Sequence, residues 1–504
     1  MWYFRAVLDQ QHIDTEEVVL VPLAELRKRD QRIAQLSFEL EQLRRLVFGA
    51  KSERNVPAVV IPEQQVLFAT EQDAVTQEQE LVNVPAHTRV KNKKKPVRTA
   101  IPAHIPRIDH VIEPENLPDG ATRIGEEITE QLHYSPAVFS VDRYIRRKYI
   151  VDGQVLIAPM PSLAFPKSDL GPTLAAQICV SKFCDHLPLY RQVQIYKRAG
   201  LNTSDSTLGD WFAATATLLH PLGQVLRNTV LAEKYLQADE SPIPVQYNHK
   251  KEAPRKGFQW VYYAPLIKTV LFDYQRGRSA EFPKDMLKEY QGALQTDGYA
   301  GYEKIVARDG MLGLACMAHA RRKFEKALDN DKVRSEYALG KIRELYQIER
   351  NCADRFSETG KADHELRHRY RRLYACPILL DLEQWIKQEI MLVAPKSPIG
   401  AAFAYALHRW PRLCAYTKDG LYQIDNNAIE NTIRPFAIGR KNYLFAGSDK
   451  GAQHAALLYS LLGTCKLQGI EPLAYLTDVI TRISDHKANA LQELLPQNWV
   501  PLAK

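Results

Sequence analysis

The stretch LYQIDNNAIENTIRPF, residues 421–436, sets a glutamate, Glu430, between residues that favour turns or helix caps and an Arg-Pro pair that disfavours helix. A helix here would be capped by Asp425 or an adjacent asparagine, because short polar side chains accept hydrogen bonds from the first backbone amides. We expect Pro435 to end the helix, since the residue before a proline avoids helical geometry. Glu430 is therefore predicted to lie in the first two turns of a short helix.

Helical spacing divides this segment into two faces. Asn426, Glu430 and Arg434 recur every four residues and share one face. Ile429 and Ile433 lie on another face, which we expect to pack against a core. Glu430 would then project from a rigid, half-buried element, as chemistry that needs a fixed carboxylate requires.

Two aspartates in a more β-rich part of the chain are candidates to act with Glu430. Asp239 lies in EKYLQADESPIPVQ, and Asp297 lies where the run GALQT gives way to DGY. Mg²⁺ takes oxygen ligands, and two such ions about 3.5–4 Å apart can activate an attacking oxygen and stabilise a leaving oxygen in phosphoryl transfer. Three carboxylates from different elements can hold two ions and share one. Mg²⁺, with Mn²⁺ as a substitute, is the expected cofactor.

Each acid also has an ordinary explanation. Asp239 and Glu240 can be solvated loop acids before SPIP, Asp297 can belong to a common Asp-Gly turn, and Asp425 can be only a cap. Spacing alone favours these explanations for any single residue.

The charge distribution points to a polyanionic partner. Over 504 residues the net charge is +8, with 45% hydrophobic and 25% charged residues, which is typical of a soluble protein of several domains. Basic residues cluster in five runs, at 89–98, 143–149, 320–324, 367–372 and 439–443, and several of these runs are interleaved with tyrosines. One run is usually a solvated face, but several together favour nucleic acid.

Cysteine usage and hydropathy predict a cytoplasmic protein. The seven cysteines are scattered and never spaced C-x-x-C, which fits reduced thiols and no zinc site. No apolar run is long enough to span a bilayer, and the first residues resemble neither a signal nor a transit peptide.

The N-terminal part of the chain predicts a coiled coil followed by a linker. In residues 22–54 apolar side chains repeat every seven residues, with Arg29 as the flaw. Dimerisation is favoured over packing on the chain's own surface. Residues 57–120 are rich in Pro, Gln, Lys and Glu, which is typical of a linker that is at least partly disordered.

Residues 185–219 have the outline of a helix-turn-helix. Leu189, Val193 and Tyr196 share one helical face, Ala199-Gly200 breaks the helix, and Ser204 or Ser206 can cap a second one. A DNA-reading motif and a purely structural helical hairpin fit this pattern equally well. Alternation predicts β-structure in 138–151, short strands follow from 231, and helices are expected in 325–395 and at the C-terminus.

Several motifs together resemble the insertion sequence 66 family of DDE transposases. They are VSKFCDHLPLYRQVQIYKRAGLNTSDSTLGDW (180–211), LQADESPIPV (236–245), LQTDGYAGYEKI (294–305), ACMAHARRKF (315–324), the block 424–476, ELLPQNW (493–499) and LRRLVFGAKSER (43–54). The resemblance implies a multidomain α/β protein with a ribonuclease H-like catalytic core, a helical insertion, an N-terminal coiled coil and a helical DNA-binding region. It makes Asp239, Asp297 and Glu430 the catalytic, metal-binding triad.

The implied domains follow the chain in order. They are 1–56 with the coiled coil 22–54, the linker 57–120, a β segment and helix-turn-helix-like region 121–233, the catalytic core 234–324 and 400–450, the insertion 325–399, and a helical region 451–504.

Two departures from the family pattern bear on function. The family's cysteine-based zinc segment corresponds to 114–127, which holds no cysteine, so this degenerate segment is expected to hold no zinc and its contact with DNA is in doubt. Asn431 stands where the family commonly has arginine after the glutamate. Arg434, Arg440 and Lys441 remain available to contact phosphate.

Candidate DNA contacts come from three places in the chain. They are Thr203, Ser204 and Ser206; His319, Arg321 and Arg322; and Arg434, Arg440 and Lys441. For the 315–324 motif, a helix with one apolar and one solvated basic side is nearly as good an explanation. Phosphate contacts of this kind would add affinity but no sequence information.

The expected function is transposition. The protein would bind the terminal inverted repeats of its element, cut at the ends, and join the 3′ hydroxyls to target DNA, as a nucleoid-associated homodimer or higher oligomer with accessory proteins of the same element. One alternative is an inactive, transposase-derived DNA-binding protein or repressor. A second is a metal-independent carboxylate-pair hydrolase, against which the basic runs count.

Overall fold

The computed structural model describes residues 80–84, 87–91, 138–146, 148–151, 154–157, 159–166, 168–246, 254–357 and 363–502. Contacts divide the chain into two compact units, Met1–Leu132 and His133–Lys504. The first unit contains an antiparallel hairpin of β1 (Glu80–Val84) and β2 (His87–Lys91). This hairpin falls within the stretch predicted to be a linker. The predicted coiled coil, 22–54, and the cysteine-less segment, 114–127, lie outside the described residues.

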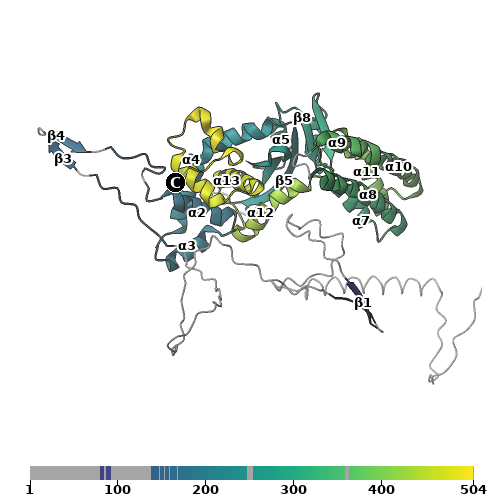
Figure 1. Ribbon diagram of the computed structural model, residues 1–504, viewed down its shortest axis with the longest axis horizontal. Helices are drawn as coiled ribbons and strands as arrows, with labels where there is room; N and C mark the ends of the chain where they lie inside the picture. The colour runs from purple at the N-terminus through teal and green to yellow at the C-terminus, as the bar shows by residue number, and fades with distance from the viewer. Residues whose placement is uncertain are drawn as a thin grey trace, which may run out of the picture. The chain divides into compact units, whose positions relative to one another are not determined.

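The second unit is built on a five-stranded mixed sheet (Figure 1). Its strands are β5 (Tyr235–Val245), β6 (Arg255–Ala264), β7 (Thr269–Gln275), β8 (Gly292–Thr296) and β9 (Met311–Ala315). The spatial order is β7-β6-β5-β8-β9. β7, β6 and β5 pair antiparallel, whereas β5, β8 and β9 pair parallel, so the central strand β5 joins the two halves.

Helices surround this sheet. They are α2 (Pro172–Phe183), α3 (Leu189–Arg198), α4 (Asp205–Leu231), α5 (Glu281–Met286), α6 (Glu303–Val306), α7 (Met317–Lys326), α8 (Lys332–Ser357), α9 (His364–Tyr370), α10 (Cys376–Glu389), α11 (Pro398–Cys414), α12 (Asn427–Tyr443), α13 (Asp449–Gln468) and α14 (Pro472–Arg482). A separate hairpin pairs β3 (Lys148–Val151) with β4 (Gln154–Ile157). None of the described helices is long and apolar enough to cross a membrane.

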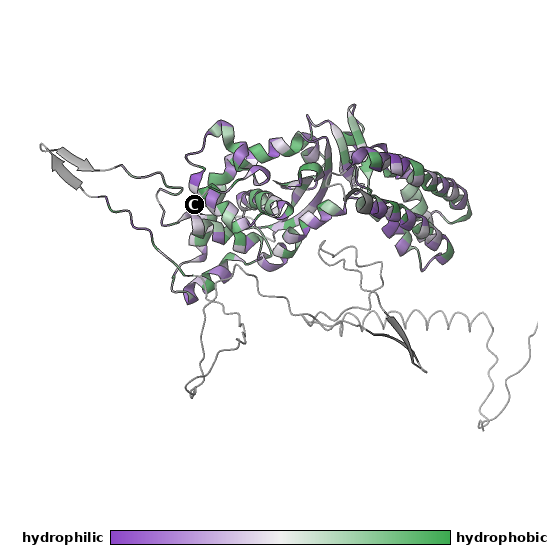
Figure 2. Cartoon of the chain, viewed as in Figure 1, coloured by the Kyte–Doolittle hydropathy of each residue, from purple (hydrophilic) through white to green (hydrophobic). Residues whose placement is uncertain are grey.

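Successive side chains of a strand belong to different hydrophobic cores, because they point to opposite faces of the sheet. On β6, Val261 and Tyr263 join the core formed with α2, α4, α12, α13 and α14. Trp260 and Tyr262 join a smaller core on the other face, with α5 and α6. A third core unites the ends of β8 and β9 with α7, α8, α10 and α11. Figure 2 shows hydrophilic and hydrophobic residues interspersed along the outer helices, as expected of elements with one face on a core.

Most elements predicted from the sequence in this unit are confirmed. β5 to β8, the short helix after β7 and the helices in 325–395 lie where the patterns place them. In 138–151 only β3 is a strand, and residues 138–146 have no regular structure. The strand β9, MLGLA, was not predicted, because it is short and contains a glycine.

The prediction that Pro435 ends the helix after Glu430 is wrong. α12 continues through Pro435 to Tyr443. The missing amide leaves the carbonyl of Asn431 without its helical partner, but Asn431 is exposed and water can serve instead. Phe436 and Gly439 are buried beyond the proline, so tertiary packing holds the second half of the helix in place.

Candidate active site

Asp239 and Asp297 lie next to each other at the same level of the sheet. The parallel pairing of β5 with β8 ends at Ala238 and Thr296, and each aspartate is the next residue along the chain. Adjacent strands lie ~4.8 Å apart, so this register brings the two aspartates to neighbouring positions. Both side chains are half-buried.

Two side chains of α11 form hydrogen bonds to the turn after Asp297. Gly298 has a φ of +93°, and a Cβ there would lie 2.5 Å from Arg409 Nε, so this position requires glycine. The Arg409 guanidinium donates to the Gly298 carbonyl at 2.9 Å, and the Tyr405 hydroxyl donates to the Asp297 carbonyl at 3.2 Å. The Asp297 carboxylate itself accepts a hydrogen bond from the Tyr299 amide at 2.8 Å.

A buried set of glutamines joins the two strands to the segment before α12. Gln237 donates to Gln295 Oε1 at 3.0 Å and to Gln423 Oε1 at 2.8 Å. Gln295 donates in turn to the Gln423 carbonyl at 2.9 Å, and the Tyr235 hydroxyl bonds to Gln295. We call Gln237, Gln295 and Gln423 the glutamine clamp.

The clamp also places the first turn of α12. Gln237 donates to the Asp425 carbonyl at 3.1 Å and accepts from the Ile429 amide at 3.1 Å. Glu430 follows Ile429 directly on α12, and Asp239 lies two residues from Gln237 on β5. Residues two apart on a strand share a face, so Gln237 and Asp239 point the same way. The clamp therefore brings Glu430 to the face of β5 that Asp239 occupies.

Asp425 turns the chain into α12. Its Oδ1 accepts from the Asn427 amide at 3.1 Å, and its Oδ2 accepts from the Tyr346 hydroxyl of α8 at 2.7 Å. Burial raises the pKa of Asp425, although these hydrogen bonds oppose the shift. The helix N-cap is Asn426, whose side chain makes no capping hydrogen bond.

The three carboxylates interact electrostatically. Burial raises the pKa of Asp239 well above its ordinary value, and the charges of Asp297, Glu240 and Glu430 raise it further. Glu240 is an additional acid of the site, with only 2% of its side chain exposed. Burial raises its pKa, while the hydrogen bond from Arg278 lowers it. Asp239 thus lies in a region with an excess of negative charge.

The Arg278 side chain covers one side of this acidic group. Its Nε donates to Glu240 Oε1 at 2.6 Å, and its guanidinium lies 4.2 Å from the centre of the Tyr299 ring. Glu240 Oε2 is buried and has no hydrogen-bond partner among the described residues.

His319 and Asn426 border Glu430 on the side of α7. His319 Nε2 lies 3.8 Å from Glu430 Oε1. Asn426 is fully buried, and neither polar atom of its side chain has a partner within the described part of the chain; the same holds for His319 Nδ1. The backbone N–H of Asn426 donates to Cys316 Sγ at 3.5 Å, and burial raises the pKa of the Cys316 thiol.

The donor chemistry of this site fits a hard divalent cation, but the side chains do not converge on one point. Carboxylate oxygens, surplus negative charge and an unpartnered buried oxygen on Glu240 are what Mg²⁺ or Mn²⁺ would satisfy. In the described ranges no three His, Cys, Asp or Glu side chains form a group close enough to hold a metal ion. Binding would therefore require the carboxylates to draw closer together.

The predicted DNA contacts fall into separate groups. Ser204 accepts from the Thr207 amide at 3.1 Å and so caps α4, with Ser206 beside it; Thr203 Oγ1 is buried without a partner among the described residues. Gly200, with a φ of +92°, makes the break before this cap, as predicted. α3 touches α12 where Arg191 donates to Asn442 at 3.3 Å.

The basic residues of α7 and α12 differ in how far they are engaged. Arg321 pairs with Glu325 at 2.9 Å, whereas Arg322 is exposed. On α12, Arg434 is half-buried, Lys441 is exposed, and Arg440 donates to Ser241 Oγ of β5 at 2.9 Å.

The glutamine clamp was missed in the sequence, although a signal for it exists. The first two acids occur in the same pattern, Leu-Gln-x-Asp, at 236–239 and 294–297. A repeated glutamine two residues before a candidate acid on a strand indicates a polar side chain on the same face. Glu240, Arg278 and Asn426 were also not singled out for the site.

The structure thus combines a mixed α/β fold with acids at the end of the β5–β8 parallel pairing and a third acid on α12. Comparison with known proteins is more specific. A family profile described as "Transposase IS66 family" matches residues 167–454, and one described as "IS66 C-terminal element" matches 460–497. A third, "Transposase C of IS166 homeodomain", matches 35–109. The chain belongs to the IS66 transposase family.

Relatives of similar length occur in Sinorhizobium fredii. Uncharacterized protein y4hP is 32% identical over 503 residues, which cover 93% of this chain and 89% of that protein. Uncharacterized protein y4jD is 32% identical over 505 residues, covering 93% and 95%, and y4qI is 31% identical over 499 residues, covering 94% and 90%. The similarity thus extends along nearly the whole chain.

Proposed function

We propose that this protein is an active transposase that cuts DNA at the ends of an insertion element and joins the 3′ hydroxyls to target DNA. The observation that carries the proposal is the strand register that sets Asp239 of β5 next to Asp297, which follows β8, together with the charge of Glu430 of α12 acting on Asp239. Membership of the IS66 transposase family agrees with it.

Asp239, Asp297 and Glu430 would hold the divalent ions of the reaction. When bound, such ions supply Lewis-acid stabilisation of the oxygens at the phosphorus and lower the pKa of bound water. The chain's own contribution is positional. The glutamine clamp and the Arg409 contact fix the backbone of the acids, and the Arg278 pair holds Glu240 beside them.

The strand order supports a ribonuclease H-like core. Three antiparallel strands followed by two parallel ones, with the first acid on the central strand, agree with the expected core at 234–324 and 400–450. Helices α8 to α10 then form the insertion, 325–399, between the second and third acids. The N-terminal coiled coil would pair protomers, so that two DNA ends are held in one complex.

Double-stranded DNA is the proposed partner, contacted at the phosphates by α7 and α12 and by the helix-turn-helix-like pair α3 and α4. The exposed Arg322 and Lys441 are suited to this role. Such contacts weaken as salt rises, because each bound phosphate releases counterions. Accessory proteins of the same element are expected to assist.

A strand-transfer assay on DNA carrying the element ends tests the proposal. The wild type should form joined products with Mg²⁺ or Mn²⁺ and none with EDTA. Asp297→Asn should reduce product at least about 1000-fold while DNA binding is retained, because it removes one metal-binding charge at nearly constant shape. Binding without strand transfer in the wild type would instead favour the inactive repressor.

A further inference from the structure

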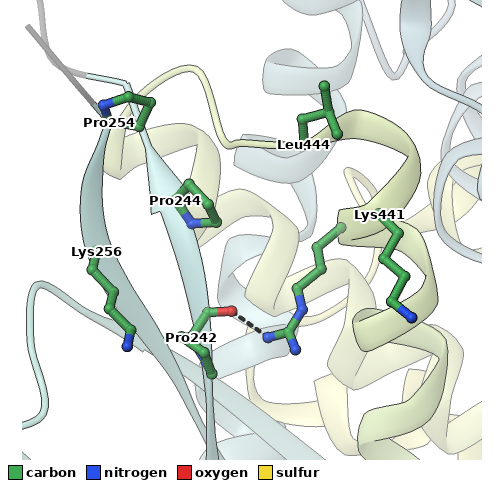
Figure 3. A pocket seen from close by; sticks show the side chains of 7 residues that line it. Pro242, Pro244, Pro254, Lys256, Lys441 and Leu444 are labelled. Carbon is green, nitrogen blue, oxygen red and sulfur yellow. Dashed lines mark hydrogen bonds between the residues drawn. The ribbon is translucent and has the colours of Figure 1, made fainter. Parts of the chain in front are cut away.

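A groove with an apolar floor and a cationic rim runs beside the C-terminal half of β5 (Figure 3). Its volume is about 480 Å³. Figure 3 shows the prolines on the strand side and Lys441 with Leu444 across from them on the helix side. The lining residues are Pro242, Pro244, Pro254, Lys256, Arg440, Lys441 and Leu444.

The groove exists because β5 continues beyond its partner β8. The pairing with β8 stops at Ala238, so residues beyond it have a free edge on that side. The segment after α12 covers part of the edge, since the Ala446 amide donates to the Pro244 carbonyl at 2.9 Å. Arg440 ties the end of α12 to the same strand by donating to Ser241 Oγ and to the Pro242 carbonyl. Both walls are therefore held by hydrogen bonds.

The turn that carries Leu444 is strained and exposed. Leu444 has a φ of +65°, which an L side chain rarely adopts, and its exposed fraction is 64%. Neighbouring Phe445 is 40% exposed. Two large apolar side chains held at the surface by a strained backbone are typical of a binding element.

The charge at the rim is uncompensated. Lys256 and Lys441 are both exposed, and no carboxylate of the described residues forms an ion pair with either. Arg440 adds a third positive charge. The rim therefore complements an anion. The prolines and Leu444 are apolar and offer an anion no hydrogen-bond or charge partner.

The groove is close to the candidate catalytic acids. Pro242 is three residues from Asp239 on the same strand, a separation of ~10 Å along the strand at 3.3 Å per residue, and this odd spacing turns the two side chains to opposite faces of the strand. A DNA strand whose phosphate lies at the acids would reach the groove within a few nucleotides.

We propose that this groove binds unpaired nucleotides of the DNA strand that lies at the catalytic acids. A base contacts the floor of prolines and Leu444, and the flanking phosphates contact Lys256, Arg440 and Lys441. Paired bases are stacked inside a duplex and expose no face to such a floor, so the groove prefers a frayed or single-stranded end. This proposal rests on the proposed function, because it places DNA at that site.

Leu444→Gly tests the apolar contact without harming the fold, since glycine adopts a positive φ freely and relieves the strain. The probe is a short oligonucleotide with 2-aminopurine at its unpaired 3′ end, and fluorescence titration of the full chain measures its affinity. We expect a loss of roughly three- to tenfold for Leu444→Gly, with affinity for a blunt duplex unchanged. Equal losses for both DNAs, or none for either, would overturn the proposal.

Lys256→Ala and Lys441→Ala test the rim, with Lys332→Ala of α8 as a control because Lys332 is likewise exposed. Each rim variant should lower the salt dependence of oligonucleotide binding by about 0.7 in the logarithmic slope, and the control should not. Competition by polyglutamate that matches competition by DNA would identify an acidic peptide site and overturn the proposal.

The groove and the catalytic proposal can fail separately. Strand transfer by the wild type with unchanged oligonucleotide binding in all three groove variants would refute only the groove. Weakened oligonucleotide binding in those variants, without strand transfer by the wild type, would refute only the catalytic proposal.

Discussion

Gln237 is completely buried, yet each polar atom of its side chain amide has a partner. Such a residue is specified by its contacts rather than by hydrophobicity, because an unsatisfied buried amide would cost about 1–3 kcal/mol. Its partners are in the strand β8 and in the segment that leads to Glu430. The position of one carboxylate thus depends on a neutral residue on another element.

Gln237→Leu should separate positioning from folding. The leucine keeps most of the volume but leaves the Ile429 amide and the Asp425 carbonyl without their partner, so we expect a loss of about 2–4 kcal/mol in the free energy of unfolding. We also expect strand transfer at saturating DNA to fall at least tenfold with DNA affinity nearly unchanged. Urea unfolding and single-turnover kinetics measure the two effects. Equal activity in the wild type and Gln237→Leu would contradict the role.

At the scale of elements, a buried arginine of the helical insertion connects the insertion to the segment before α12. Arg371, with 0% exposure, donates to both oxygens of Glu349 at 2.8 and 2.7 Å. It also donates to the carbonyls of Tyr416, Asp419 and Tyr422 at 2.9, 2.7 and 2.8 Å. Arg371 opens a π-helical turn that ends at Ala375. The insertion therefore organises the chain that leads into Glu430.

Glu349→Gln should destabilise the protein in a pH-dependent way. Burial opposes ionisation of Glu349, but Arg371 and then Arg367 outweigh burial and lower its pKa. A depressed carboxyl pKa stabilises the fold above the unfolded value of ~4.3, and this stabilisation is lost as pH falls through the folded value. We expect the variant to lose about 3–5 kcal/mol near pH 7, since one partner of a buried pair is removed.

The difference between wild type and Glu349→Gln should shrink as pH is lowered below about 4, in urea titrations at several pH values. Glu336→Gln is the matched control, because Glu336 forms an exposed pair with Lys332 and should change stability by less than about 1 kcal/mol. A pH-independent loss in Glu349→Gln would show that packing, not the charge, is responsible.

At the scale of the whole molecule, the three candidate ligands belong to elements that are distant in the chain. Asp239 lies on β5, Asp297 directly follows β8, and Glu430 lies on α12, with the insertion between the second and third of these acids in the chain. A bound ion would link these elements in the folded state only. Binding to the folded chain alone raises stability by about 2.7 kcal/mol at a ligand concentration of 100 times Kd.

Mn²⁺ should therefore raise the melting temperature of the wild type. The Asp239→Asn and Glu430→Gln variants should lose most of this shift, whereas Asp285→Asn, an exposed acid of α5, should keep it. Scanning calorimetry with and without Mn²⁺ makes the measurement. An identical shift in all four proteins would place the ion elsewhere.

The amino-acid sequence by itself determined most strands and helices of the second unit, and the resemblance of its motifs to a family proposed the three acids. Alternation, helical spacing, the Ser204 cap and the Gly200 break are local features, and local chemistry suffices to read them. The family was also evident from motifs. The continuation of α12 through Pro435 was not, because burial of Phe436 outweighs the local preference.

Only the tertiary structure decided which side chains surround those acids. Gln237 and the Asp425 carbonyl that it contacts are 188 residues apart, and Arg371 is 22 residues from Glu349 on a different helix. Such contacts depend on strand register and helix packing, which join distant segments and leave no periodicity in the sequence. The buried Arg371 pair and the groove beside β5 could therefore be found only in the folded chain, whereas the repeated Leu-Gln-x-Asp pattern indicates two residues of the glutamine clamp.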